Sequence, residues 1–265
     1  MAKKRLDVLL TEKGLCPSRE RAKTAIMEGI VYIAGQKAGK AGDMVDENAP
    51  LEVRGNENAF VSRGGKKIEK ALDYFAIDPA GLVAMDVGAS TGGFTDCLLR
   101  RGAVRVYSID VGYGQLAWSL RQDPRVKCME RTNIRHVTPD MLDEAPALCA
   151  IDVSFISLRL VLPVVSELLT ADGCVACLIK PQFEAGKGKV GKKGVVREPQ
   201  IHQEVLAQFV ENAHAAGFAV QDITFSPIKG PEGNIEFLGY LTKQGVDHIP
   251  DLQEIVRQAH EELDG

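Results

Sequence analysis

The sequence has few aromatic residues and no long uncharged apolar run. Aromatic residues make up 6% of the 265 residues, and there is a single tryptophan. The longest apolar stretches, near 160–165 and 174–179, are interrupted by acidic residues and are far shorter than the roughly 18 residues of a membrane helix. Charged residues follow the basic first residues, where a secretory signal would have an apolar core. We therefore expect a cytoplasmic protein without a membrane span.

Closely spaced cysteines are also scarce, which argues against a zinc site. Of six cysteines, only Cys174 and Cys177 form a C-x-x-C pair. They lie in an apolar run typical of a buried strand, where positions three apart point to opposite faces. No second Cys or His pair lies nearby, as structural zinc requires. We expect free thiols and no bound metal.

What the chain does contain is typical of a globular protein. Hydrophobic residues are 45% and charged residues 26%, which excludes a largely disordered or fibrous chain. The net charge of -4 excludes a general polycation, yet residues 1–40 hold nine Lys/Arg against four Asp/Glu. Residues 41–60 hold one against five. A basic first segment on an acidic chain predicts a local patch for an anionic partner.

The first 58 residues predict a small α+β domain. Ser18 is a good N-cap, and Gly14 is the expected end of the helix before it. An acidic stretch with Pro50 then leads into a linker that ends near residue 58. The expected elements are helices at 5–14 and 19–28 and strands at 30–33 and 51–53.

This segment resembles the RNA-binding domain named after ribosomal protein S four. The resemblance rests on Arg5-Leu-Asp, Ser18-Arg19, Ala22, Ile26, Gly29-x-Val31 and Gly35. It implies that Arg19, Lys23 and Lys37 face RNA phosphates, where each cation would release condensed counterions. The alternative is a solvated helix face that binds nothing.

From residue 61 onward, strand-like and helix-like runs alternate, which predicts a parallel sheet wrapped by helices. Strands are expected at 82–87, 104–109, 126–129, 148–153 and 174–179, followed by β-rich runs at 218–225 and 235–241. Helices are expected at 94–101, 115–120, 138–142, 158–169 and 200–216. The last two strands would form an antiparallel hairpin at the sheet edge. Seven such strands are typical of Rossmann-like methyltransferases, although strand count alone names no chemistry.

A glycine-rich turn follows the first of these strands, in Asp86-Val-Gly-Ala-Ser-Thr-Gly-Gly-Phe94. Such a turn lets backbone N–H groups and a helix N-terminus approach a ligand. No Gly-Lys-Ser/Thr ends it, so it is not a P-loop, and the dinucleotide spacing is not met. Asp110, at the end of the next strand, is suited to holding ribose hydroxyls. These residues alone are compatible with S-adenosylmethionine, with a nicotinamide cofactor, or with no ligand at all.

Four further ionisable residues bear on which chemistry this site carries out. Asp152 and Lys180 end the fourth and fifth predicted strands, at the sheet edge where ligands bind in this fold class. Lys67 lies in a glycine-rich segment before the sheet, and Glu236 lies in the last β-rich run. Taken singly, Lys67 could be an exposed helix lysine, and Glu236 could pair across the hairpin.

A Lys-Asp-Lys-Glu set on such a sheet resembles the FtsJ-type ribose 2'-O-methyltransferases. The whole chain resembles TlyA, a family of ribosomal RNA 2'-O-methyltransferases also called haemolysins. The phrases that carry this are Ser62-Arg-Gly-Gly, the turn at 86–94, Asp152-Val-Ser-Phe-Ile-Ser and Lys180-Pro-Gln-Phe-Glu. The resemblance implies a fold with a seven-stranded Rossmann-like methyltransferase sheet and a small N-terminal RNA-binding domain.

The resemblance also implies roles for individual residues. Lys180 would act as base or oxyanion stabiliser, Lys67 and Asp152 would set the charge around it, and Glu236 would orient Lys180 or the ribose. S-adenosylmethionine would be held by Asp86, Gly88, Ala89, Ser90, Gly92, Gly93, Phe94, Asp110 and Asn133. Asn133 could equally be an ordinary turn residue.

The segment 185–194 alternates glycines with lysines directly after Lys180-Pro-Gln-Phe-Glu. Glycines favour mobility and lysines attract phosphate, so we expect a lid or RNA-gripping loop; a solvated surface loop is the alternative. The RNA-binding residues expected here and near the active site are Arg63, Lys187, Lys189, Lys192 and Lys193.

The sequence thus predicts an RNA-binding domain at 1–58, a methyltransferase domain at 59–245 and an acidic C-terminal helix at 246–265 packed on it. The expected function is S-adenosylmethionine-dependent methylation of ribose 2'-hydroxyls of ribosomal RNA, within ribosomal subunits. Two alternatives stay open: a haemolysin-like membrane activity, and a non-catalytic RNA-binding role in ribosome assembly.

Overall fold

The structure is a computed structural model that describes residues 3–16, 18–27, 29–53, 60–186, 188–191 and 194–264. The chain divides into two compact units, Met1–Ala59 and Phe60–Gly265, and each has a hydrophobic core of its own. Within the described ranges, no helix combines the length and the apolar character that crossing a membrane requires.

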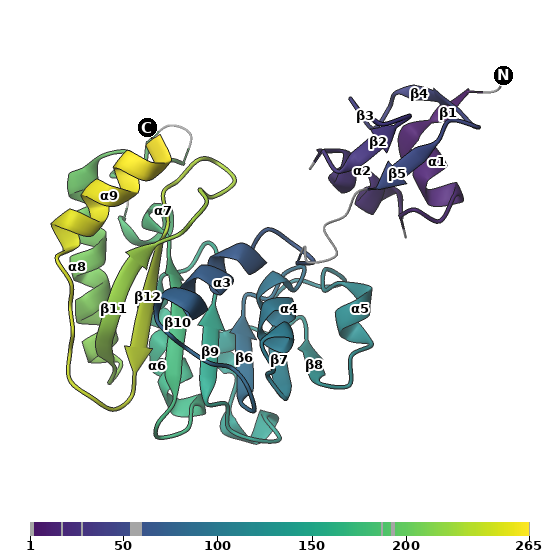
Figure 1. The fold of residues 1–265 in the computed structure, drawn as a ribbon. Helices are drawn as coiled ribbons and strands as arrows, with labels where there is room; N and C mark the ends of the chain where they lie inside the picture. The colour runs from purple at the N-terminus through teal and green to yellow at the C-terminus, as the bar shows by residue number, and fades with distance from the viewer. Residues whose placement is uncertain are drawn as a thin grey trace. The chain divides into compact units, whose positions relative to one another are not determined.

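The described residues of the first unit form two helices and five short strands. The helices are α1 (Leu6–Glu12) and α2 (Arg19–Met27); the strands are β1 (Lys3–Arg5), β2 (Val31–Ile33), β3 (Gln36–Lys37), β4 (Met44–Asp46) and β5 (Leu51–Val53). Antiparallel pairing joins β1 to β4 and, separately, β3 to β2 to β5 (Figure 1). The sequence predicted α1, α2, β2 and β5. It missed the other three strands, which are two or three residues long and mostly charged or polar.

The apolar spacing of the two helices explains their packing. Leu6, Leu9 and Leu10 of α1 are buried against Ala22 and Ile26 of α2. The spacing of three and four residues places each set on one helix face. This buried seam leaves the cationic side chains of α2 on the outside.

The second unit is centred on a seven-stranded sheet in the order β11-β12-β10-β9-β6-β7-β8 (Figure 1). Neighbours are parallel except that β12 runs antiparallel to both β10 and β11. This confirms the predicted methyltransferase-type sheet with its antiparallel end. The strands are β6 (Val83–Val87), β7 (Arg105–Ile109), β8 (Val126–Met129), β9 (Leu148–Ile151), β10 (Cys174–Ile179), β11 (Ala219–Phe225) and β12 (Phe237–Thr242).

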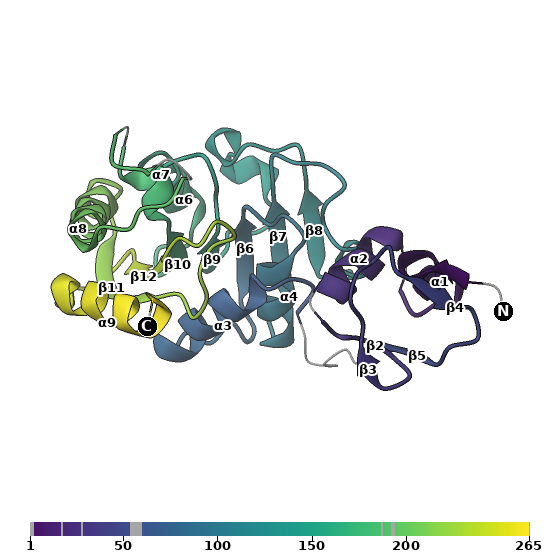
Figure 2. The same cartoon turned by 90° about the horizontal axis from the view of Figure 1, so that it is seen from above.

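Helices cover both faces of this sheet (Figure 2). Two lie on one face, α3 (Gly65–Tyr74) and α4 (Gly93–Arg100), and two on the other, α6 (Leu162–Leu168) and α8 (Pro199–Ala215). The C-terminal helix α9 (Leu252–Asp264) packs on α8 and the edge strand β11. The remaining helices are short: α5 (Trp118–Arg121) and α7 (Pro181–Glu184).

One helix prediction was wrong. Residues 138–142 form a single 3-10 turn, Pro139–Met141, and not an α-helix. The segment is too short to repay the cost of starting a helix. Similar single turns occur at Ile134–His136 and Leu158–Leu160.

Alternation along the strands separates the two faces of the sheet. Met85 lies opposite Tyr107 and Cys149, and these side chains belong to the larger cluster that contains α6 and α8. Ala150 lies opposite Ala176 on the other face, beneath α3 and α4. Because β6, β7, β9 and β10 run parallel to one another, they all end at the same edge of the sheet, where this fold class binds ligands.

Candidate active site

Two predicted residues meet at the ends of β9 and β10. The ammonium of Lys180 forms an ion pair with Asp152 and donates a hydrogen bond to Ser154 Oγ at 3.1 Å. Asp152 directly follows β9 and Lys180 directly follows β10, so the pairing of these neighbouring strands brings the two side chains together. The side chain of Lys180 is only 10% exposed. A buried ammonium requires such partners, because losing water is costly for a charge.

The other two predicted residues form a second pair. Lys67 Nζ of α3 donates to Glu236 Oε2 at 2.5 Å, across 169 positions of sequence. The Glu236 side chain is 1% exposed, and Lys67 is also buried. Lys67 is therefore not an exposed helix lysine, and Glu236 does not pair across the hairpin. The sequence analysis expected Glu236 to orient Lys180 or the ribose; in the structure its ion-pair partner is Lys67.

These four side chains line a pocket of about 540 Å³ at the carboxyl end of the sheet. Its wall also includes Arg63, Phe94 and Asn234. A second pocket of about 720 Å³ lies beside it and is lined by Asp110 and Asn133. The two pockets share Gly88, Ser90, Asp152, Ser154 and Phe155. They are therefore neighbouring compartments of one site.

The glycine turn is packed closely against the rest of this unit. A Cβ on Gly88, whose φ is +88°, would lie 2.3 Å from the carbonyl oxygen of Asp152. A Cβ on Gly93 would lie 2.3 Å from Ser62 Oγ. The sequence explained these glycines by approach of a ligand. The structure shows that both also permit close contact within the chain, which seats the turn between β9 and the start of α3.

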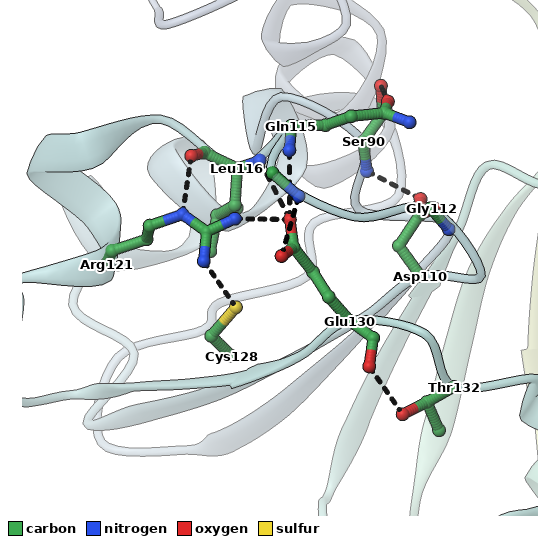
Figure 3. A network of polar contacts seen from close by, with 10 residues as sticks. Ser90, Asp110, Gly112, Gln115, Leu116, Arg121, Cys128, Glu130 and Thr132 are labelled. Atoms are coloured by element: carbon green, nitrogen blue, oxygen red, sulfur yellow. Dashed lines mark hydrogen bonds and ion pairs between the residues drawn. The ribbon is translucent and has the colours of Figure 1, made fainter.

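Asp110 holds the glycine turn from the end of β7. Its Oδ2 accepts the backbone N–H of Ser90 at 2.8 Å, and its Oδ1 accepts that of Gly112 at 2.6 Å (Figure 3). Asp110 also lines the second pocket, as Asn133 does. The Asn133 side chain accepts the backbone N–H of Arg135 at 3.1 Å and caps a 3-10 turn. Asn133 is therefore both a turn residue and a residue that lines the second pocket.

Asp86 lies elsewhere than its predicted cofactor role requires. It is fully buried and is not among the described residues that line either pocket. Its Oδ2 accepts the backbone N–H and the hydroxyl of Thr95, at 2.9 and 2.7 Å. Burial, opposed by these hydrogen bonds, raises the pKa of Asp86 to about 7. Its contacts connect β6 to the first turn of α4.

The predicted RNA-binding residues fall into separate groups. Arg63 lines the first pocket and donates to the carbonyl of Lys229 at 2.9 Å. Lys189 is exposed and pairs with Glu204 at 2.6 Å. In the first unit, Lys23 and Lys37 are exposed. The other lysines of the glycine-lysine segment lie outside the described residues: Lys187, Lys192 and Lys193.

Arg19 of the first unit is held by a buried carboxylate. Asp7 accepts from Arg19 at 3.0 Å and from two nitrogens of Arg5 at 3.0 and 3.1 Å. The guanidinium of Arg5, followed by that of Arg19, holds the pKa of Asp7 well below its usual range. Arg5 was missed as a binding candidate, although it lies in the Arg-Leu-Asp phrase that marked the domain.

Sequence reasoning also missed Phe155, which lines both pockets. Its side chain is 91% exposed, its φ is +62°, and its ring lies 5.0 Å from that of Phe183. An exposed aromatic held in a left-handed conformation is a strained arrangement of the kind found at functional sites. The only sequence signal was its position between Asp152 and Ser157.

Comparison with known proteins agrees with this geometry. Residues 60–243 match the model of the FtsJ-like methyltransferase family, and residues 4–51 match that of the S4 domain. The chain is 45% identical over 241 residues to the 16S/23S rRNA (cytidine-2'-O)-methyltransferase TlyA of Mycobacterium tuberculosis, covering 91% of this chain and 90% of the relative. The chain belongs to the TlyA family of FtsJ-like methyltransferases.

Other members of this TlyA family carry a different name. Hemolysin A of Brachyspira hyodysenteriae is 39% identical, over 89% of this chain and 98% of the relative. A solved structure of a candidate hemolysin from Streptococcus thermophilus is 45% identical and has a TM-score of 0.79, covering 100% of this chain and 98% of that one. The predicted family is confirmed, and the family and fold imply use of S-adenosylmethionine.

Proposed function

We propose that this protein transfers the methyl group of S-adenosylmethionine to a ribose 2'-hydroxyl of ribosomal RNA. The observation that carries the proposal is the convergence of Lys67, Asp152, Lys180 and Glu236 on one pocket beside the glycine turn. The named activity of the Mycobacterium tuberculosis relative supports the same chemistry.

The site is suited to binding S-adenosylmethionine across its two compartments. Asp110 and Asn133 would hold the adenosine end in the second pocket. The backbone of Gly88, Ala89 and Ser90 lies at the boundary, where the methionine end would lie beside Phe94 and Gly93. Bound there, the cofactor supplies a methyl group already activated by its sulfonium.

Lys180 is the residue placed to act on the hydroxyl. An ammonium has three hydrogens to donate. One is directed to Asp152 and one to Ser154, which leaves the third for the ribose oxygen. The 2'-oxygen would bond to the methyl carbon as the bond from that carbon to the sulfonium sulfur breaks, which leaves S-adenosylhomocysteine and releases the hydroxyl proton to solvent water. The adjacent cation would stabilise the negative charge that develops on the oxygen. Lys67 and Glu236 neutralise each other, so they line the pocket without adding net charge.

The substrate would enter past the exposed aromatic ring of Phe155. Aromatic side chains stack unpaired bases, and each such stack contributes about 1–3 kcal/mol of binding free energy. Phe155 and the adjacent Phe183 offer this surface at the pocket that holds Lys180, and Arg63 offers a cation for phosphate. The substrate we infer is therefore an unpaired nucleotide of ribosomal RNA within a ribosomal subunit.

The division of labour follows the sequence prediction. Residues 1–58 would bind RNA through cations such as Arg5 and Arg19, residues 59–245 would bind the cofactor and catalyse transfer, and the C-terminal segment would support the sheet edge. The S4 match over residues 4–51 supports the first assignment.

The test measures transfer of labelled methyl from S-adenosylmethionine to unmodified ribosomal subunits. Lys180→Ala should lower the rate at least about 100-fold, the usual size of a lost acid-base or charge-stabilising group, while S-adenosylmethionine still binds. Lys127→Ala is the matched control, because Lys127 lies on β8, pairs with Asp143 at 3.0 Å and lines neither described pocket. Full activity of Lys180→Ala would refute the assignment. Absence of cofactor binding by the unaltered protein would favour a non-catalytic RNA-binding role.

A further inference from the structure

Glu130, the residue after β8, is the centre of a polar network beside the second pocket (Figure 3). Its side chain is 8% exposed. Its Oε2 accepts the backbone N–H of Gly114 at 2.9 Å, and its Oε1 accepts those of Gln115 and Leu116 at 3.0 and 3.2 Å. Arg121 of α5 forms an ion pair with the same carboxylate. Three consecutive backbone amides and one guanidinium thus converge on a single side chain.

The segment that Glu130 holds is a wall of the proposed cofactor site. Gln115 lines the second pocket, and its Oε1 lies 3.2 Å from Ser90 Oγ in the glycine turn. One residue beyond the held segment, the N–H of Ala117 donates to the carbonyl of Thr91 at 3.1 Å. The segment therefore supports the glycine turn from outside through both side-chain and backbone contacts.

Side-chain packing also connects the held segment to the glycine turn. A Cβ on Gly92 would lie 2.8 Å from a methyl of Leu116, so this leucine already occupies the space beside the turn. Asp110 completes the arrangement by accepting N–H groups from both Ser90 and Gly112. A shift of residues 112–116 would move the turn and the Asp110 carboxylate together.

Glu130 itself is not among the described residues that line either pocket. It can influence a ligand only through the segment it holds. Arg121, followed by the three backbone N–H groups, lowers the pKa of Glu130 to about 2, so the carboxylate is charged at neutral pH.

We propose that Glu130 is a positioning residue for S-adenosylmethionine: the Glu130 carboxylate fixes residues 114–116 and thereby shapes the adenosine end of the site. The inference rests on the proposed function, because it assumes the cofactor binds there. It assigns a role to a residue that touches neither the reacting atoms nor the pocket surface.

Glu130→Gln is the sharpest substitution, because it preserves size and removes one acceptor. The amide offers a single oxygen, and its NH₂ group would face donors that now meet a carboxylate oxygen. Hydrogen bonds to a charged group are stronger than those between neutral groups, so the amide would hold residues 114–116 less firmly. We therefore expect the dissociation constant for S-adenosylmethionine to rise about tenfold or more. Glu130→Asp, which keeps the charge on a shorter stem, should recover part of the affinity.

The experiment uses the full chain and S-adenosylmethionine itself. Equilibrium dialysis gives the dissociation constant, and steady-state methyl transfer separates KM from kcat. A positioning role raises the dissociation constant and KM for S-adenosylmethionine and leaves kcat at saturation within about threefold. Trp118, the chain's single tryptophan, begins α5 two residues beyond the held segment, so its emission should differ between the two proteins.

Glu254→Gln is the matched control. Glu254 also pairs with an arginine, Arg257, and that arginine likewise lowers its pKa to about 2. It lies on α9 and lines neither described pocket, so its substitution should leave cofactor affinity unchanged.

The outcomes distinguish this inference from the function on which it rests. If the unaltered protein does not bind S-adenosylmethionine, the proposed function fails. If it binds but Glu130→Gln binds equally well, only the role of Glu130 is overturned. If circular dichroism shows that Glu130→Gln is unfolded, Arg121→Gln replaces it, since Arg121 contacts Glu130 and donates to the carbonyl of Leu116 at 3.0 Å. Unchanged affinity of that variant would equally overturn the inference.

Discussion

A single buried carboxylate, that of Asp7, orients two arginines of the S4 domain. The side chains of Arg5 and Arg19 are 48% and 50% exposed, so each guanidinium contacts Asp7 while part of it faces solvent. A cation held in this way loses less conformational entropy when it binds a phosphate. Asp7 therefore holds both guanidinium groups in place for the RNA contact proposed above.

The lowered pKa of Asp7 predicts how this contact depends on pH. The carboxyl of an unfolded chain titrates near pH 3.9. Because the folded value is lower, the stabilisation is fully present above about pH 4 and is lost as pH falls through the folded pKa. Asp7→Asn should lower hydrogen-exchange protection of the α1 amides equally between pH 5 and 8. The difference from the unaltered protein should shrink below about pH 4, and a difference independent of pH would contradict this.

For individual residues, the sequence was a better guide to which side chains lie in the pocket than to which side chains contact one another. Lys67, Asp152, Lys180 and Glu236 were all identified from their local phrases, and the structure brings all four to one pocket. Lys67 and Glu236 are 169 positions apart, so no local pattern could show that they pair. The same holds on a smaller scale for Glu130, whose contacts depend on how β7 and β8 lie side by side.

At the scale of elements, two helices of the second unit meet through a pair of histidines. His202 of α8 is buried, and its Nδ1 lies 3.0 Å from Nε2 of His260 on α9. Asp264 lies 3.0 Å from the other nitrogen of His260 and also pairs with Lys229. Burial, followed by the effect of His260, lowers the pKa of His202 to about 4.

This lowered pKa predicts that acid loosens the contact between α8 and α9. The unfolded chain binds a proton at His202 near pH 6.5, but the folded chain does so only near pH 4. Stability should therefore fall by up to about 1.4 kcal/mol per pH unit as pH drops through this window. In denaturant unfolding, the free energy of unfolding of His202→Asn should fall less steeply between pH 6.5 and 4 than that of the unaltered protein. His136→Asn, at an exposed position, is the control; an equally steep loss in His202→Asn would contradict the assignment.

The strands of the large sheet were more predictable than the short strands of the first unit. The bounds of β8 and β10 match the predicted ranges, and the burial of β10 explains its continuous apolar run. The strands β1 and β3 are short and consist of charged or polar residues, and β4 has only three residues, so none of them carries a strand pattern and their pairing comes from tertiary context. The segment 138–142 had some helical character but no partner surface long enough for a helix.

At the scale of the whole molecule, positive charge is concentrated in residues 1–40 of the first unit. Nine Lys/Arg lie within residues 1–40, against four Asp/Glu, although the chain as a whole is acidic. Phosphate contacts by such residues release counterions, so log affinity for structured RNA falls with log salt by about 0.7–0.9 per contact. The first unit should therefore account for much of the affinity for RNA and much of its salt dependence.

A chain of residues 60–265 tests this division. It is one of the two compact units, with its own core and both pockets, so it should fold and bind S-adenosylmethionine as tightly as the full chain. Its affinity for ribosomal RNA should be lower, with a salt slope shallower by at least about two contacts, those of Arg5 and Arg19. Filter binding across a salt series measures both. An unchanged slope would show that the first unit makes no phosphate contacts.

The proposed reaction places the methyl group on a ribose oxygen of ribosomal RNA. Alkali cleaves RNA by using the free 2'-hydroxyl, so a methylated 2'-oxygen leaves the adjoining phosphodiester intact. The most direct measurement is alkaline hydrolysis of ribosomal RNA labelled by the unaltered protein and S-adenosylmethionine, with Lys180→Ala beside it. We expect label in an alkali-resistant dinucleotide, and none with Lys180→Ala. Label released entirely in mononucleotides would place the methyl group on a base and refute ribose methylation.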